Sequence, residues 1–216
     1  MTGDTLQIVI QVLALLFAVS FHESAHGWVA WKCGDPTARD LGRISLNPLR
    51  HIDPVGSVLV PAVLAFSGAP VFGWAKPVPV ALDRTRDPRS ANLLISAAGP
   101  ISNLILAGLF AIAITMVRQE DGSFGVDSRI GAALLWFGRF SVRINVVLAV
   151  FNLLPIPPLD GFGVLESLLP RSMAPLAYWM RHYGMLILLA VILSGALSWI
   201  LAPAQNAVLH WMLGRS

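Results

Sequence analysis

Two histidines and one glutamate stand in the spacing His22-Glu23-Ser24-Ala25-His26. Residues four apart lie on one face of an α-helix, so both imidazoles can bind a single metal ion while Glu23 lies beside them. Chance alone produces this pattern on the order of 0.002 times in a chain of this composition. The spacing is typical of zinc hydrolases, in which the glutamate accepts a proton from water.

A catalytic zinc ion usually takes three protein ligands and leaves its fourth position to water. Asp160 is the candidate third ligand because it follows Pro155-Ile156-Pro157-Pro158-Leu159, which cannot be regular helix. Such a break at membrane depth is tolerated only where protein buries it or it lines a wet cavity, and Gly161 allows another backbone to approach. The alternative role for Asp160 is the N-cap of the helix that follows. We expect the other histidines to be solvated, in loops or near the membrane surface: His51, His182 and His210.

The composition is that of an integral membrane protein. Hydrophobic residues make up 56% of the chain and charged residues 12%, against roughly 25% charged in soluble proteins. The net charge of +3 needs no nucleic-acid partner, because Lys and Arg in the loops of a membrane protein record its orientation. The single cysteine, Cys33, excludes an intrachain disulfide and a multi-cysteine metal cluster. The first apolar segment contains both histidines of the motif, so we expect a retained span and no cleaved signal peptide.

Apolar stretches predict an all-α, polytopic bundle of about four full spans, with a re-entrant hairpin and short interfacial helices. Asp53-Pro54 and Asp87-Pro88 are helix-start signals, and a short helix is expected over 163–169. We treat 1–216 as one domain, with its core over 5–169. The predicted spans are 5–31, 90–117, 130–154, which is embedded from about residue 141, and a C-terminal span over 183–202.

The charges of the loops predict the topology. Segments 32–53 and 76–89 each carry four Lys or Arg, which places both in the cytoplasm. The apolar segment between them, 54–75, must then enter and leave on the same side as a hairpin. Counting the crossings brings Asp160 to the cytoplasmic side, where the histidines already lie. We therefore expect a multi-pass protein of a prokaryotic inner membrane with its site towards the cytoplasm.

Two motifs together carry a family resemblance. The chain resembles the site-2 protease family of intramembrane zinc metalloproteases in two motifs, His22 to His26 and the run from Phe151-Asn152-Leu153-Leu154 through Gly161. Further segments of the family are similar to Gly99-Pro100-Ile101-Ser102-Asn103 and to 73–80. The resemblance implies one Zn²⁺ per chain on His22, His26 and Asp160, with Glu23 as the base. It also implies that Asn152 assists near the reacting carbonyl and that 73–80 meets the substrate. The segment 118–129 is too short for a PDZ domain and the C-terminal end leaves no room for a CBS pair, so the chain looks like the compact form.

A substrate helix hides its carbonyls in its own hydrogen bonds, so it must unwind locally before it is cut. Pairing with an exposed extended segment would satisfy its backbone groups. We assign this role to 74–80 and name as substrate contacts Trp74, Lys76, Pro77 and Val78, although a plain connecting loop is an equal alternative. Asn103 is a further candidate for contact with substrate, or a polar residue that packs between spans.

The function predicted from these features is zinc-dependent endopeptidase activity on transmembrane segments of membrane-protein substrates, as in regulated intramembrane proteolysis. Its partners would be a substrate helix and the lipid bilayer. A zinc carrier or metal sensor is the alternative from another class, and an inactive relative that binds helices without cutting them is a third. Glu23 separates these hypotheses, because only hydrolysis depends on it.

Overall fold

The computed structural model describes residues 3–68, 73–117 and 129–213, and these are helices joined by turns, with no strand among them. The long helices are α1 (Gly3–Cys33), α4 (Pro88–Met116), α5 (Arg129–Asn152), α7 (Ala174–Leu193) and α8 (Ala196–Leu213). The short helices are α2 (Thr37–Asp40), α3 (Val60–Ser67) and α6 (Asp160–Leu168), with a π-helical turn at Pro54–Leu59 and 3₁₀ turns at Pro48–Arg50, Leu82–Arg84 and Arg171–Met173. The predicted all-α class is confirmed.

Four segments are long and apolar enough to cross a membrane: Thr5–Cys33, Pro88–Met116, Ile130–Asn152 and Arg171–Leu193. Their outer faces expose large apolar side chains, including Leu13, Ile105 and Leu186. A lipid-facing surface accounts for such exposure, because water would penalise so much apolar area. The chain is therefore a multi-pass integral membrane protein, as predicted.

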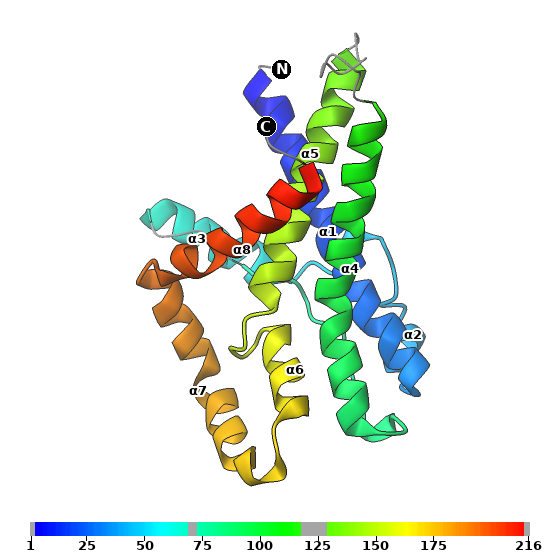
Figure 1. The fold of residues 1–216 in the computed structure, drawn as a ribbon, viewed down its shortest axis with the longest axis vertical. Coiled ribbons are helices and arrows are strands. Elements are labelled where there is room, and N and C mark those ends of the chain that lie inside the picture. The colour runs from blue at the N-terminus through cyan, green and yellow to red at the C-terminus, as the bar shows by residue number, and fades with distance from the viewer. Residues whose placement is uncertain (1–2, 69–72, 118–128, 214–216) are drawn as a thin grey trace.

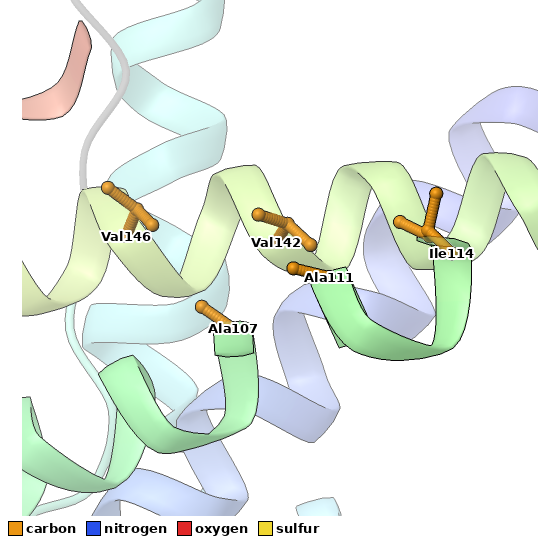
Figure 2. Packing of buried hydrophobic residues seen from close by; sticks show 5 residues of the cluster. All are labelled: Ala107, Ala111, Ile114, Val142 and Val146. Carbon is orange, nitrogen blue, oxygen red and sulfur yellow. The ribbon is translucent and has the colours of Figure 1, made fainter. Parts of the chain in front are cut away.

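Helices α1, α4 and α5 pack side by side as the centre of the molecule (Figure 1). Small residues line their contacts, with Ala14 and Ala18 of α1 almost completely buried. Figure 2 shows the contact between α4 and α5, which buries Ala107, Ala111, Ile114, Val142 and Val146. Small side chains let helices approach closely within a membrane, where van der Waals packing drives their association. This bundle fixes the helix that carries both histidines.

The cap signals operate as expected. The Asp87 side chain accepts a hydrogen bond from the Arg89 amide at the start of α4, and Pro88 takes the first helical position. The Asp53 side chain likewise accepts from the amides of Val55 and Gly56, at 2.9 and 2.7 Å. Each carboxylate satisfies helix-end amides that would otherwise lack partners.

The segment 54–75 returns to its starting point. Its apolar helix, Pro54–Leu64, is too short to span. The Trp74 amide donates to the Gly56 carbonyl at 3.1 Å, and the Ser57 hydroxyl donates to the Trp74 carbonyl at 2.8 Å. Both ends therefore lie together, as a hairpin that enters and leaves on one side requires, while α3 projects sideways from the bundle (Figure 1).

The C-terminal elements differ from the prediction. A single span over 183–202 is wrong, because α7 begins at Ala174, ends at Leu193 and gives way to α8 at Ala196. Gly195 makes this break with a φ of +73°, a conformation that a residue with a side chain rarely adopts. Helix α6 begins at Asp160, three residues before the predicted start, with Leu159 as its N-cap residue.

Candidate metal centre

His22, His26 and Asp160 converge at the junction of α1 and α6. The Nε2 atoms of the two imidazoles are 3.1 Å apart. The Oδ2 atom of Asp160 lies 3.1 Å from His22 Nε2 and 3.4 Å from His26 Nε2. Both histidines are buried, with exposed fractions of 7% and 9%. The structure thus brings Asp160 against two histidines that lie far from it in the sequence.

The outer nitrogens of both imidazoles are occupied by acceptors. His22 Nδ1 lies 2.5 Å from the Asn103 side-chain oxygen, and His26 Nδ1 lies 2.7 Å from the Ile95 carbonyl. Because an oxygen of this kind accepts, each Nδ1 carries the proton and each Nε2 presents a lone pair. Such bonds set the tautomer and orientation that a metal-binding histidine needs.

Three electron-rich atoms consequently face one another without a donor among them. Asp160 Oδ2 is buried and accepts no hydrogen bond from the part of the chain that the structure describes. Burying a carboxylate oxygen against two lone pairs is unfavourable unless a cation lies between them. Two imidazoles and one carboxylate form a typical zinc donor set, so these residues fit the ion that the motif predicts.

Gly99 of α4 leaves room for this cluster. A Cβ atom at this position would lie 2.4 Å from His26 Nε2 and 2.6 Å from His22 Nε2. Gly161 serves the other side, because a Cβ there would lie 2.1 Å from the Leu153 carbonyl oxygen. The expected close approach at Gly161 is confirmed, and it lets the proline-rich bend place Asp160 against the histidines. Leu159 is the N-cap residue of α6 and Asp160 is its first helical residue, so the N-cap alternative for Asp160 does not hold.

Asn145 is a residue that the sequence reasoning missed. The Asn103 side-chain amide donates to Asn145 Oδ1 at 2.7 Å, and the Asn145 amide donates to the Ser141 carbonyl at 2.8 Å. Both asparagines are fully buried, so Asn103 supports His22 and the predicted substrate contact at Asn103 does not fit. A polar residue inside an apolar span was the available signal for Asn145.

Glu23 is held by the segment predicted to meet substrate. Its Oε2 atom accepts a hydrogen bond from the Val78 amide at 3.0 Å. Two residues earlier, the Lys76 amide donates to the His51 carbonyl at 2.8 Å. Trp74 and Lys76 are exposed on the same segment, and of the four candidate contacts Val78 is the one that the structure places against the glutamate.

Two other residues named from the sequence are Asn152 and His51. The side-chain amide of Asn152, the last residue of α5, donates to the Leu148 carbonyl at 2.9 Å, and its role near substrate stays a prediction. His51 was expected to be solvated, which is wrong: it is 2% exposed, and its Nε2 lies 2.7 Å from the Ser45 carbonyl. That carbonyl also accepts from the Ser24 hydroxyl, so the loop folds onto the motif helix and buries the imidazole.

Comparison with known proteins agrees with this geometry. The model of a family described as peptidase family M50 matches residues 10–194. YwhC of Bacillus subtilis, named as a zinc metalloprotease candidate, is 36% identical over 198 residues, covering 91% of this chain and 85% of that protein. Rip2 of Mycolicibacterium smegmatis, named in the same way, is 31% identical over 196 residues, covering 88% of this chain and 69% of its own. No solved structure matches the chain.

Proposed function

This chain belongs to peptidase family M50, the site-2 proteases, and from that membership we propose that it is a zinc metalloprotease that hydrolyses peptide bonds within or near transmembrane segments of other membrane proteins. The observation that carries the proposal is the convergence of His22, His26 and Asp160 beside Glu23. The setting supports the intramembrane part, because α1 and α4, which surround the site, are apolar spans.

The residues of the site divide the work. His22, His26 and Asp160 would hold zinc, which when bound supplies an acidified water and polarises the substrate carbonyl. Glu23 would accept the proton of the attacking water and pass it to the leaving amine. Asn103 and the Ile95 carbonyl keep both imidazoles oriented with their Nε2 lone pairs inward.

We propose that the extended segment from Trp74 to Val80 receives the unwound substrate. Its contacts with Gly56, His51 and Glu23 use the backbone groups of Trp74 and Lys76 and the Val78 amide. The Val78 carbonyl and the Val80 amide make no hydrogen bond to the described residues. They are one acceptor and one donor beside the base, as a substrate strand requires. We place this site towards the cytoplasm on the charge of the flanking loops.

A zinc carrier would need metal ligands at several levels along a path across the membrane, whereas the described residues hold one group of three side chains that could bind a metal.

The decisive experiment measures zinc content and cleavage of a reporter transmembrane helix in detergent. Glu23→Gln should keep about one zinc per chain and lose cleavage by a factor of at least about 100. Asp160→Ala should lose the zinc, while Asp83→Ala, at an exposed site, should retain both properties. Full cleavage by Glu23→Gln would refute the proposal.

A further inference from the structure

We propose that Arg43 is a positioning residue for Glu23: it holds the extended segment from Lys76 to Val78 so that the Val78 amide anchors one oxygen of the glutamate. The inference rests on the proposed function, because it assigns a support to the base of that reaction. Arg43 belongs to none of the motifs that identify the site, and the sequence analysis assigns no role to the Val78 amide towards Glu23.

The first step is the contact at Glu23 itself. Its Oε2 atom accepts from the Val78 amide at 3.0 Å, and its Oε1 atom has no hydrogen bond from the described residues. A glutamate side chain has three rotatable bonds, so without an anchor its carboxylate samples several positions. Anchoring one oxygen leaves the other free to accept a proton in a fixed place, which is what an oriented base requires.

The second step is the location of Val78. The residues around it belong to no helix and no strand ladder, so contacts with other parts of the chain determine where the backbone runs. The Lys76 amide, which donates to the His51 carbonyl at 2.8 Å, is one of them. On the N-terminal side, the Arg43 guanidinium donates to the carbonyls of Lys76 and Pro77 at 2.7 and 3.3 Å. On the C-terminal side, buried Asp35 accepts from the Ala81 amide at 2.6 Å. Val78 lies between these two attachments.

The third step concerns the choice of arginine. One terminal nitrogen of Arg43 reaches two successive carbonyls, and its Nε is buried without a partner among the described residues. A buried guanidinium N–H without a partner is unfavourable, so packing alone does not favour this side chain. Lysine offers a single ammonium on a flexible stem and can replace only part of the attachment.

Kinetics of reporter cleavage provides the first test. Arg43→Gln should lower kcat about 10-fold with zinc content unchanged, Arg43→Lys should recover part of the loss, and Arg86→Gln should match the wild type. Arg86 is exposed on the same side, and its side chain makes no hydrogen bond or ion pair with the described residues, so it controls for charge. Wild-type kcat in Arg43→Gln, an equal loss in Arg86→Gln, or loss of zinc would overturn the proposal.

Removing single backbone amides of the segment distinguishes an effect on the base Glu23 from an effect on substrate binding. Val78→Pro removes the amide bonded to Glu23, whereas Val80→Pro removes an amide without a partner, and both residues already follow a proline. We expect Val78→Pro to lower kcat about 10- to 100-fold and Val80→Pro to raise KM. An equal loss of kcat in both variants would mean that the segment is merely disrupted.

A third measurement needs no activity. In a Cys33→Ser background, Glu23→Cys and Val78→Cys can be joined by a short bismaleimide, and adding Arg43→Gln should lower the yield several-fold, while adding Arg86→Gln should not. An unchanged yield on adding Arg43→Gln refutes the positioning role even if the wild-type protein cleaves the reporter. A lower yield, together with a wild-type protein that cleaves no reporter, would support the positioning and count against the proposed function alone.

Discussion

At the scale of single residues, the site depends on the missing side chain of Gly99 as well as on the polar side chains that support the histidines. Gly99 faces the two imidazoles, and a Cβ atom there would lie within 2.6 Å of both Nε2 atoms. Asn103 and Asn145 then fix one imidazole from behind through two buried hydrogen bonds. A buried polar chain of this kind is stable because every link has a partner.

We predict that Gly99→Ala weakens zinc binding about 10- to 100-fold, because the new Cβ would lie 2.4 Å from His26 Nε2. Gly108→Ala is the matched control, since it lies on the same helix and a Cβ there has nothing within 4 Å. Zinc content after dialysis against a graded chelator measures the difference. Equal zinc retention in the two variants would contradict the geometry.

The sequence predicts the three residues that the structure brings together as a candidate metal site, because their signals are local: a helical spacing and a proline-rich break. Arg43 and the Val78 amide have no such signal. From the sequence, an arginine that positions another segment cannot be told from one that only sets the orientation in the membrane. A backbone amide has no sequence signal, because every residue except proline carries one. His51 shows the same limit, because its burial comes from the loop that folds over it.

At the scale of elements, Asp35 joins the end of α1 to the segment that supports Glu23. Its side chain accepts from the Thr37 amide at 3.0 Å and from the Ala81 amide at 2.6 Å. Burial by itself raises the pKa of Asp35, but the hydrogen bonds from Thr37 and Ala81 outweigh it and leave the pKa below its ordinary 3.8. The ionised carboxylate is therefore the form that stabilises the fold.

We predict that Asp35→Asn costs about 1.5–3 kcal/mol at neutral pH, because an amide nitrogen cannot accept from Ala81. Since the folded pKa is lowered, the wild-type advantage is present above about pH 4 and is lost as the pH falls through the folded pKa. Thermal unfolding in detergent between pH 3 and 7 measures the gap, with Asp83→Asn at an exposed site as the control. A gap that widens in acid would contradict this account.

The boundaries of α1 and α4 follow from apolar length and the Asp87-Pro88 cap, so the sequence places them within a few residues. The boundaries of the C-terminal helices cannot be predicted in this way, because the hydropathy of the sequence shows no interruption at Ser194-Gly195-Ala196. The break there depends on a positive φ at Gly195, and composition does not specify that angle.

At the scale of the whole molecule, the ends of α1 and α4 define two sides. The segments 34–53 and 81–87 meet through contacts such as the hydrogen bond from the Ala81 amide to the Asp35 side chain at 2.6 Å. Met116 lies at the opposite end of α4, one full span away. From the positive-inside rule we propose that the first side faces the cytoplasm.

We predict the outcome of cysteine labelling in a Cys33→Ser background. Leu46→Cys and Arg86→Cys should react with an impermeant maleimide from the same side of sealed membranes, and Met116→Cys from the other. All three native side chains are exposed, so access depends on the bilayer alone. Labelling of Leu46→Cys and Arg86→Cys from opposite sides would require 54–75 to cross the membrane.

The site joins α1 to α6, and synthesis delivers these elements at different times. A ribosome that has finished α1 has made both imidazoles, but the carboxylate follows only after α4 and α5 have been made. Because chains emerge from their N-terminus, a nascent molecule lacks its third ligand while it is being inserted. The order of synthesis alone would thus keep an incomplete chain from cleaving other membrane proteins while it is being inserted.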